Sequence, residues 1–387
     1  MIRVLNIIET ISSGGVERRR LSMAKLLDKS TFELKIICTN SYGSFADEIR
    51  KHGVEVIEIG SLTNFLDVKQ HLKVQKIIAN FKPHIIHGAI FEGVTMAAIN
   101  GFWKRVPIII LEETSDPQTR SWKGNLLMKA LTLLAHKVIG VSPAATNYLI
   151  NTLKIGKNKV ALITNGIATP RTVSLDETIM LKKQLNISEH EIVIGSIGRM
   201  TDDANKRFSD LINAFAILVK KQLPVKLILV GDGVEKKKYI QQVQNLGLQK
   251  QVFFAGYQAD TSLYYSIFDV FSLVSSHESF GLVLAEAMFH KLPIVATKVG
   301  GMKYIVDDKE TGFLVEKYDV KSIASKLETL CENKQLRQEF GQKGFLKATQ
   351  NYTEERYVNT IKELYSNLVT RHFRTVQPDK INKTTQQ

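Results

Sequence analysis

Short apolar runs rich in β-branched residues alternate with helical stretches along this chain, and they fall into two sets. This alternation is typical of parallel sheets whose strands are joined by crossover helices. In the first half, strands are expected at residues 3–8, 33–39, 54–59, 84–88, 107–111, 137–141 and 159–164. In the second half, they are expected at residues 192–197, 225–230, 251–255, 270–274, 293–297 and 312–315. We therefore predict an α/β protein with two parallel-sheet domains.

The two sets are separated by a segment that loses apolar periodicity and carries turn residues, Asn165-Gly-Ile-Ala-Thr-Pro-Arg-Thr. We place the hinge there, so that residues 1–168 form the first domain and residues 169–352 the second. A terminal helix is expected within residues 353–370. The polar, aperiodic residues 371–387 are predicted to form a disordered basic tail. A chain of 387 residues is long enough for two such cores.

Basic charge is concentrated in the first half of the chain. Residues 1–170 contain 22 Lys and Arg against 13 Asp and Glu, within a formal net charge of +14 for the whole chain. Such asymmetry indicates that the N-terminal half contacts an anionic surface, with anionic lipid and nucleic acid as the candidates. Nucleic acid is not expected as a partner, because no recognition motif accompanies the charge.

The cysteine content and the start of the chain bear on the compartment. Cys38 and Cys331 are the two cysteines, so the chain has neither a disulfide framework nor a zinc pattern, which favours a reducing, cytoplasmic compartment. The chain opens on a run that reads as a buried strand rather than a signal peptide. No apolar run reaches the ~18 residues that span a bilayer.

A basic amphipathic helix is expected over residues 120–137. The apolar residues on one side are Trp122, Leu126, Leu127, Ala130, Leu133 and Leu134, and those mostly on the other are Lys123, Asn125, Lys129 and His136. Such a helix either packs on the core or lies on an anionic membrane. The nearby segment Gly101-Phe-Trp-Lys-Arg105 adds aromatic and basic side chains, so peripheral binding to the inner face of a membrane is a candidate role of this domain.

Two carboxylates lie eight residues apart in Glu278-Ser-Phe-Gly-Leu-Val-Leu-Ala-Glu286, between two expected strands. Ser279 is expected to cap a helix there. The open amides at its start would be those of Phe280, Gly281 and Leu282. Such amides bind anions, and Glu286 would lie roughly 9–10 Å further along the helix. This spacing suits a ligand with a diphosphate in the middle and hydroxyls at both ends. Solvated glutamates are the alternative, but a helix start at the carboxyl edge of a sheet favours a ligand.

Two further strand ends carry residues suited to a diphosphate. After the first strand, Ser12-Ser13-Gly14-Gly15-Val16-Glu17-Arg18 opens a helix, and the paired glycines allow a ligand to approach closely. Arg18, Arg19 and Arg20 are expected to add positive charge there, although a tight turn that needs a positive φ fits the glycines equally well. In the second domain, Arg199 at a strand end and Lys206 at the next helix start could clamp a diphosphate.

Metal chemistry has little support in the sequence. His84 and His87 flank one strand, so at most one could face a ligand, and we interpret both as structural. The chain contains no H-x-E, D-x-D or C-x-x-C pattern that would indicate a metal site.

Taken in order, these motifs resemble those of retaining glycosyltransferases of the GT-B, family 4 type. The resemblance covers approximately residues 2–368 and is carried by Gly14-Gly15-Val16-Glu17-Arg18, Gly198-Arg199 with Lys206, Glu278 to Glu286, and Val299-Gly300-Gly301. It implies two Rossmann-like domains that face one another across a cleft. In this arrangement the N-terminal domain binds the acceptor, the C-terminal domain binds the nucleotide-sugar, and the last helix crosses back to the first domain.

The resemblance also implies roles for individual residues. Arg199 and Lys206 hold the diphosphate, Glu278 contacts the transferred sugar, and Glu286 holds the ribose hydroxyls. The amides of Phe280, Gly281 and Leu282 bind the distal phosphate, and Gly15 closes on the phosphates from the other domain. Glu278, Arg199 and Lys206 are thus the expected catalytic residues. Such enzymes usually retain anomeric configuration and need no divalent metal, so neither a metal nor a cofactor is expected.

The chain departs from the family pattern at two places in particular. The family often has a histidine after the strand at residues 107–111, where this chain has Glu112 and Glu113; we assign Glu113 to the acceptor side. The loop from Arg199 to Lys206 is about two residues longer than usual, which bears on how Lys206 reaches a phosphate.

We predict that the protein transfers a sugar from UDP- or GDP-sugar to a carbohydrate or lipid-linked carbohydrate during surface polysaccharide or glycolipid assembly. Two alternatives remain open. A nucleotide-sugar epimerase on the same architecture would convert the donor alone, and a non-catalytic homologue would bind the nucleotide-sugar without turnover.

Overall fold

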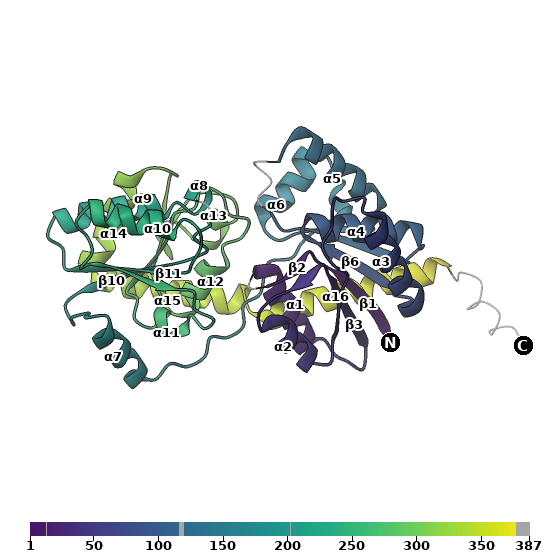
Figure 1. Ribbon diagram of the computed structural model, residues 1–387, viewed down its shortest axis with the longest axis horizontal. Helices are drawn as coiled ribbons and strands as arrows, with labels where there is room; N and C mark the ends of the chain where they lie inside the picture. The colour runs from purple at the N-terminus through teal and green to yellow at the C-terminus, as the bar shows by residue number, and fades with distance from the viewer. Residues whose placement is uncertain (13, 116–119, 202, 377–387) are drawn as a thin grey trace, which may run out of the picture. The chain divides into compact units, whose positions relative to one another are not determined.

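The computed structural model of the chain describes residues 1–12, 14–115, 120–201 and 203–376 (Figure 1). The chain divides into two compact units. The first unit comprises Met1–Gly166 and Glu354–Gln387, and the second comprises Ile167–Thr353. Each is built on one main parallel sheet, which confirms the fold class. In the described part of the chain, no helix is both long enough and apolar enough to cross a bilayer.

The first unit contains a seven-stranded sheet in the order β5-β3-β1-β6-β7-β8-β9. Its strands are β1 (Ile2–Ile7), β3 (Phe32–Cys38), β5 (Glu55–Glu58), β6 (Ile85–Ala89), β7 (Ile108–Glu113), β8 (Lys137–Gly140) and β9 (Val160–Leu162). All the strands expected in this half are confirmed. The sequence did not reveal β2 (Thr10–Ile11) and β4 (Asn40–Ser41), which pair with each other, because two residues are too short for an apolar period.

Helices cover both faces of this sheet. They are α1 (Gly15–Leu26), α2 (Phe45–Lys51), α3 (Val68–Phe81), α4 (Ile90–Trp103), α5 (Trp122–Leu134), α6 (Pro143–Asn147) and α16 (Glu354–Val376), with π and 3-10 turns at Tyr148–Thr152 and Lys157–Lys159. One apolar core lies between the sheet and α1, α2 and α16, and a second lies between the sheet and α3, α4 and α5.

The last helix, α16, packs into the first unit although its sequence follows the second. Tyr357, Val358, Ile361 and Tyr365 supply its buried side. The helix continues to Val376, so the prediction of disorder from Arg371 is wrong as far as residue 376. In this last stretch, the rings of His372 and Phe373 lie against those of His136 and His84, with centroids 6.4 and 6.0 Å apart. The rest of the predicted tail, residues 377–387, lies outside the described residues.

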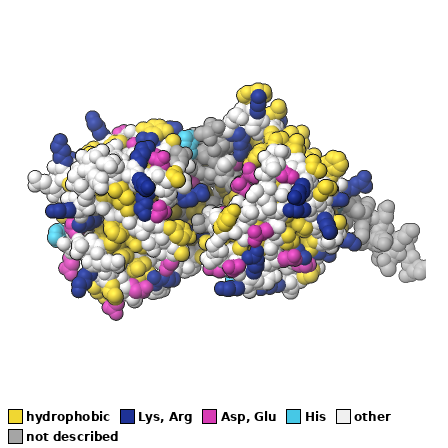
Figure 2. Space-filling model, in the orientation of Figure 1, with side chains coloured by type: hydrophobic (Ala, Val, Ile, Leu, Met, Phe, Trp, Pro, Cys, Tyr) yellow, Lys and Arg dark blue, Asp and Glu magenta, His cyan; other side chains and the backbone are white. Residues whose placement is uncertain are grey.

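Helix α5 has apolar side chains on two sides. Met128 and Leu131 are buried in the core, whereas Trp122, Leu126 and Leu133 are exposed. Figure 2 shows hydrophobic side chains gathered over this part of the first unit. The helix therefore packs on the core, where Leu127 and Leu134 of the predicted apolar side also make contact, while the other three large residues of that side remain exposed.

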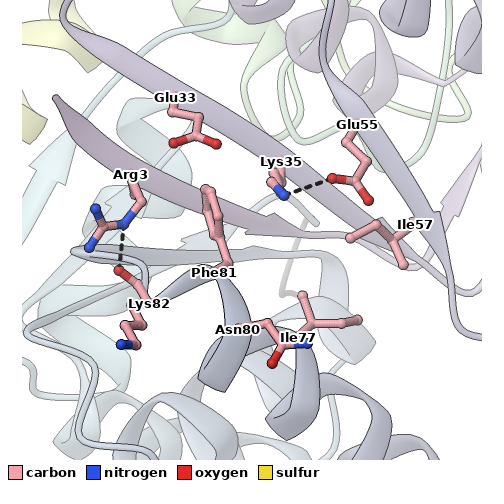
Figure 3. Close-up of a pocket in the computed structure, with 9 residues that line it drawn as sticks. All are labelled: Arg3, Glu33, Lys35, Glu55, Ile57, Ile77, Asn80, Phe81 and Lys82. Carbon is pink, nitrogen blue, oxygen red and sulfur yellow. Dashed lines mark hydrogen bonds and ion pairs between the residues drawn. The ribbon is translucent and has the colours of Figure 1, made fainter.

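A hollow of about 520 Å³ lies near the amino ends of β1, β3 and β5 (Figure 3). Three of its charged side chains are already engaged, since Arg3 donates to the Lys82 carbonyl and Lys35 forms an ion pair with Glu55. None of the predicted site residues lines it. Ligands of open α/β sheets bind at the carboxyl ends of the strands, and this hollow lies at the other edge of the sheet. We therefore do not assign the candidate site to this hollow.

The second unit contains a six-stranded parallel sheet in the order β12-β11-β10-β13-β14-β15. Its strands are β10 (Ile192–Ile197), β11 (Val225–Val230), β12 (Val252–Gly256), β13 (Val270–Leu273), β14 (Ile294–Thr297) and β15 (Gly312–Val315). Its helices are α7 (Leu175–Gln184), α8 (Asp203–Lys206), α9 (Phe208–Lys220), α10 (Lys236–Asn245), α11 (Ser262–Tyr265), α12 (Leu282–Phe289), α13 (Met302–Ile305), α14 (Val320–Glu332) and α15 (Lys334–Asn351). Every strand expected in this half is confirmed.

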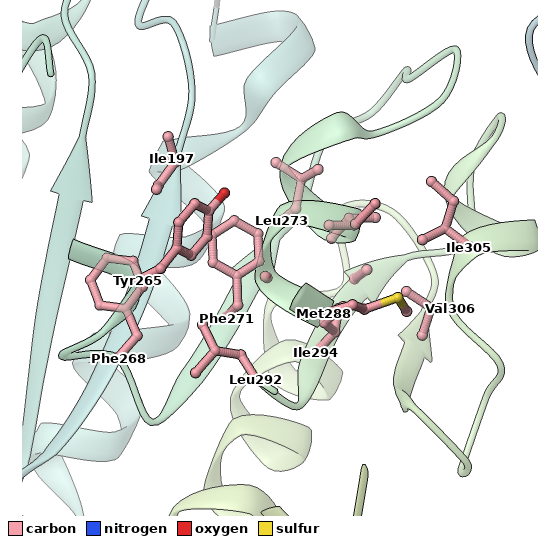
Figure 4. Close-up of a cluster of buried hydrophobic side chains, with 14 of the residues drawn as sticks. Ile197, Tyr265, Phe268, Phe271, Leu273, Met288, Leu292, Ile294, Ile305 and Val306 are labelled. Carbon is pink, nitrogen blue, oxygen red and sulfur yellow. The ribbon is translucent and has the colours of Figure 1, made fainter. Parts of the chain in front are cut away.

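Two apolar cores hold this unit together, one on each face of the sheet. Helices α9, α10 and α14 cover one face, and α11, α12 and α13 cover the other. Figure 4 shows part of the core that α12 covers, in which Tyr265 lies against Phe271 and the Met288 side chain lies beside Val306. Because the buried side chains of α12 pack in this core, the first turn of the helix has a defined position at the carboxyl edge of the sheet.

Candidate functional site

The strand order of the second unit reverses between β10 and β13. The chain runs outward from β10 to β11 and β12, and then returns to place β13 on the other side of β10. The loop that contains Arg199 follows β10, and the loop that contains Glu278 follows β13. Open α/β sheets bind ligands beyond the carboxyl ends of the strands at such a reversal. The predicted donor-binding residues of the second unit therefore meet at the edge where a ligand site is expected.

Hydrogen bonds and an ion pair join these two loops. The Ser276 N–H donates to the Asn205 carbonyl at 2.7 Å, and the Ser276 hydroxyl donates to the Ala204 carbonyl at 2.5 Å. In the ion pair, Lys206 Nζ lies 2.7 Å from Glu278 Oε2. The two side chains are 20% and 19% exposed, so the pair is open to water on one side. Two residues that the sequence assigned to one pocket are thus in direct contact.

Lys206 is the last residue of a helical turn, α8, which ends the loop that follows β10. Asp203 at the start of α8 accepts hydrogen bonds from the Tyr239 hydroxyl at 2.9 Å and the Ser209 hydroxyl at 2.6 Å. Burial favours a higher pKa for Asp203, but these hydrogen bonds outweigh it and lower the pKa. The loop that starts at Arg199 therefore ends in a fixed turn that presents Lys206. No motif in the sequence indicated the role of Asp203, because its partners lie on two other elements.

Arg199 differs from Lys206 in its surroundings. It is exposed, and its guanidinium makes no hydrogen bond or ion pair with any of the described residues. An unpaired guanidinium at this edge is free to bind phosphate oxygens in bidentate fashion.

The start of α12 differs from the prediction. Gly281, at φ +98°, is the N-cap and Leu282 the first helical residue, and no side chain caps the helix, so the assignment of Ser279 as N-cap is wrong. The left-handed conformation at Gly281 is accessible to glycine and delays the helix by two residues. The N–H groups of Phe280, Gly281 and Leu282 still meet no acceptor within the described ranges. The Phe280 ring is buried against Tyr352, with centroids 5.6 Å apart, and fixes the position of these amides.

The Gly300-Gly301 pair positions the Glu278 loop. The Gly301 N–H donates to the Glu278 carbonyl at 2.9 Å. A Cβ added at Gly301 would lie 2.3 Å from the Ser279 carbonyl oxygen, so a larger residue would displace the loop. This close approach gives a physical reason for the paired glycines that the sequence showed.

Glu286 is buried on α12 and has a partner that the sequence did not reveal. The Tyr265 hydroxyl donates to Glu286 Oε2 at 3.0 Å. Tyr265 in turn stacks on His290, with ring centroids 4.9 Å apart and an interplanar angle of 15°. Burial lowers the pKa of His290 to about 4, so this ring is neutral at pH 7. The Glu286 carboxylate is thus oriented by a neutral aromatic pair.

The first unit contains a buried charge cluster that the sequence did not predict. Arg19 and Arg20 on α1 both form ion pairs with Glu112 on β7, and Arg20 Nη2 lies 2.9 Å from Glu112 Oε2. All three side chains are at most 2% exposed, so the prediction that Arg19 and Arg20 add positive charge at the helix start is wrong. Burial alone would raise the pKa of Glu112, but the two guanidiniums hold it well below its usual value.

His87 completes this cluster from β6. Its Nε2 lies 3.4 Å from Glu112 Oε2, and its Nδ1 is hydrogen-bonded to the Tyr365 hydroxyl of α16 at 2.7 Å. Burial lowers the pKa of His87, which favours the neutral ring. Of the two histidines that flank this strand, His87 is therefore fully enclosed, while the Nδ1 of His84 accepts from the Arg3 N–H at 2.9 Å. Both have structural partners.

The side chain of Glu113, the last residue of β7, contacts residues of the segment that follows this strand. Arg120 Nη1 lies 2.5 Å from Glu113 Oε2, and the Ser115 hydroxyl donates to Glu113 Oε1 at 2.5 Å. Its side chain is only 3% exposed, whereas that of Arg120 is 18% exposed.

Gly15, the other predicted residue of this unit, is the first residue of α1. Gly14 before it has φ −82°, so the turn does not require a left-handed glycine.

Known proteins resemble the chain over most of its length. Two family models match it, Glycosyltransferase Family 4 over residues 13–171 and Glycosyl transferases group 1 over residues 178–347. The capsular polysaccharide biosynthesis glycosyltransferase CapM of Staphylococcus aureus is 25% identical over 361 residues, which is 88% of this chain and 92% of that protein.

A second relative and a solved structure extend this likeness. The UDP-Gal:alpha-D-GlcNAc-diphosphoundecaprenol alpha-1,3-galactosyltransferase of Escherichia coli is 22% identical over 370 residues, which is 92% of this chain and 94% of that protein. The crystal structure of Anabaena HepE in complex with UDP and glucose superposes with a TM-score of 0.84 at 23% identity, covering 95% of this chain and all of that one.

Proposed function

Because the chain belongs to the group 1 glycosyltransferases of the GT-B type, we propose that it moves a sugar from a nucleoside-diphosphate sugar to a carbohydrate or lipid-linked carbohydrate. The observation that carries this proposal is the contact of Lys206 with Glu278 at the strand reversal of the second unit, beside the open amides of α12. That arrangement combines a cation for the phosphate, donors for its oxygens and a carboxylate for sugar hydroxyls.

The relatives support the classes of donor and acceptor. The name of the Escherichia coli relative includes a UDP-sugar donor and a diphosphoundecaprenol-linked acceptor, and the Anabaena protein was crystallised with UDP and glucose. The Staphylococcus aureus relative acts in capsular polysaccharide biosynthesis. We assign this chain, by analogy, to surface polysaccharide or glycolipid assembly with a UDP- or GDP-sugar as donor.

Each residue of the second-unit site receives one role in this proposal. Arg199 and Lys206 bind the diphosphate and neutralise the charge that develops as it leaves. The amides of Phe280, Gly281 and Leu282 bind the phosphate next to the sugar. When phosphate oxygens meet Lys206, they take the place of the Glu278 carboxylate, which then accepts hydrogen bonds from the sugar. Glu286, oriented by Tyr265, accepts from the ribose hydroxyls.

The proposed step retains the configuration of the sugar carbon. The bond from that carbon to the phosphate oxygen breaks, and a bond to the acceptor hydroxyl oxygen forms on the same face. The acceptor proton passes to the departing phosphate oxygen. No divalent metal takes part in this proposal, because the two cations and the helix start supply the positive charge. Gly15 and Glu113, in the other unit, are assigned to the donor phosphates and to the acceptor side.

Transfer is tested with purified protein, UDP- and GDP-sugars and a panel of carbohydrate and lipid-linked acceptors, with and without a chelator. We expect nucleoside diphosphate release that requires acceptor and survives chelation, and NMR of the product should show the anomeric configuration of the donor. An inverted product overturns retention, and complete loss of release on chelation overturns the metal-free step.

Incubation with donor alone separates transfer from the two alternatives. Conversion of the donor sugar without acceptor indicates an epimerase. Donor binding without either reaction, across the panel and in the presence of lipid, indicates a non-catalytic homologue. Glu278→Gln should abolish transfer while the protein still binds the nucleoside diphosphate in a thermal-shift assay, because the carboxylate contacts the sugar rather than the diphosphate.

A further inference from the structure

Five large apolar side chains stand exposed where α4 ends and along α5 of the first unit. Trp103, Trp122 and Leu133 are 72%, 71% and 73% exposed, and Leu126 and Phe102 are 62% and 59% exposed. The two helices pack against each other and cover the same face of the sheet. We call these five residues the apolar outer face. The two tryptophans in it are the only ones in the chain.

Packing within the unit does not account for this face. Trp122, Leu126 and Leu133 follow one another at helical spacing along α5, whereas Met128 and Leu131 on the opposite side reach the core. A helix that already buries one apolar side has no structural need for a second. Exposed apolar patches of this kind mark interaction sites.

The charges around the face indicate what it contacts. Lys104, Arg105, Lys123 and Lys129 are all exposed, and none forms an ion pair within the described residues. Lys129 falls on the same stripe as Trp122 and Leu133, and α5 contains no acidic residue. Tryptophan and lysine together are characteristic of the interface of a bilayer, where the rings lie at headgroup level and the amines meet lipid phosphates.

A second copy of this chain fits the face poorly. A two-fold contact would place the same patch on both partners, and the lysines and arginine of one copy would then meet those of the other. Like charges in such a contact are costly, because neither side supplies a carboxylate. An anionic bilayer instead supplies both the apolar layer and the negative charge that the face lacks.

We propose that the apolar outer face docks on the surface of an anionic lipid bilayer, with Trp103 and Trp122 at the level of the headgroups. The inference goes beyond sugar transfer and does not depend on it, although docking would bring the protein to an acceptor held in the membrane. Binding is tested without donor or acceptor, so its failure would leave the proposed transfer unaffected.

The two tryptophans provide a direct measurement, because they are the only ones in the chain and both lie on this face. Vesicles of phosphatidylglycerol and phosphatidylcholine are expected to shift the tryptophan emission of the full chain to shorter wavelength. Brominated lipid in these vesicles should quench that emission. Vesicles of phosphatidylcholine alone should bind at least about tenfold more weakly, since each basic side chain near an anionic surface contributes to binding.

Matched variants distinguish binding through this face from non-specific adsorption of the protein to vesicles. Leu126→Gln with Leu133→Gln keeps both tryptophans and should lower the partition coefficient on anionic vesicles about tenfold. Ile179→Gln with Met180→Gln on α7 of the second unit, at sites 53% and 70% exposed, should leave it unchanged. Lys123→Gln with Lys129→Gln should also weaken binding, whereas Lys183→Gln with Lys237→Gln removes the same charge from the second unit and should not.

Three results would overturn the proposal. Equal binding to neutral and anionic vesicles would remove the charge argument, and wild-type binding by the Leu126/Leu133 variant would remove the face itself. An emission shift that follows protein concentration rather than lipid would show that a second copy covers the face. All substitutions are at exposed positions, and circular dichroism spectra should match that of the wild type.

Discussion

Both units bring arginine or lysine together with glutamate at the carboxyl ends of parallel strands, but they differ in exposure to water. In the first unit, the side chains of Arg19, Arg20 and Glu112 are at most 2% exposed. In the second, the Lys206–Glu278 pair is about one-fifth exposed and Arg199 lies in solvent. A fully buried pair cannot exchange partners without a large desolvation cost, whereas a partly exposed pair can. Similar residue types therefore serve structure in one unit and suit ligand binding in the other.

The largest expected effect is on stability in the first unit. Glu112→Ala leaves two guanidiniums buried without a partner, so the free energy of unfolding should fall by roughly 3–5 kcal/mol. Urea denaturation measures the change, and Glu278→Ala is the control, with an expected loss of about 1 kcal/mol. Equal losses in the two variants would contradict the comparison.

If Glu112→Ala does not fold, a second variant keeps the test decisive. Replacement of the three charged residues of the cluster, by Arg19→Met, Arg20→Met and Glu112→Leu, leaves none of them buried without a partner and should restore a foldable chain. A triple variant that also fails to fold would show that the cluster is needed for more than charge balance.

The next effect is on activity in the second unit. Lys206→Ala should lower kcat/KM for transfer by about 10²–10³-fold, because it removes a cation from the leaving diphosphate. Its free energy of unfolding should change by no more than about 1 kcal/mol. Lys221→Ala, which breaks an exposed pair with Glu328 away from the strand ends, is the matched control and should keep full activity. Activity retained by Lys206→Ala would remove Lys206 from the site.

A smaller effect is expected for the pH dependence of the free energy of unfolding of the second unit. The pKa of His290 is lowered to about 4 from its usual 6.5, so on acidification the unfolded chain takes up this proton before the folded chain does. The linked stability is complete above pH 6.5 and is lost as the pH falls towards 4, with about 2 kcal/mol lost at pH 5.

Two variants check the source of that loss. His290→Phe keeps a ring to stack on Tyr265 but cannot titrate, so unfolding between pH 7 and pH 5 should depend less on pH than in the wild type. His190→Gln, at an exposed position, should behave as the wild type does. A wild-type pH dependence in His290→Phe would place the titrating group elsewhere, for example at His87.

The smallest effect concerns the start of α12. Since Gly281 rather than Ser279 is the N-cap, Ser279→Ala should change the free energy of unfolding by less than about 0.5 kcal/mol. Ser174 is a true N-cap, in a capping box with Glu177, and Ser174→Ala should cost about 1 kcal/mol. Denaturation curves of both variants test this, and an equal cost would restore Ser279 as a cap.

Most of the fold was accessible from the sequence because the apolar periods report local burial. The main strands of both sheets were located, and so were the loops that carry Arg199, Lys206 and Glu278. The side chains that position the site residues could not be predicted from the sequence. Tyr265 reaches Glu286 from a different helix, and Asp203 is held by Tyr239 from another, so neither contact has a sequence spacing that reveals it.

The sequence by itself determined two parallel-sheet units and a set of charged residues at their strand ends, since both follow from patterns within one segment. Only the tertiary structure decided which of those charges are buried. In the sequence, Arg19 and Arg20 look like any basic residues at a helix start. The structure shows that both form buried ion pairs with Glu112 of β7. The same holds for α5, whose apolar residues were visible but whose exposed side was not. Burial depends on what packs against a residue from distant segments, and a single segment does not record that.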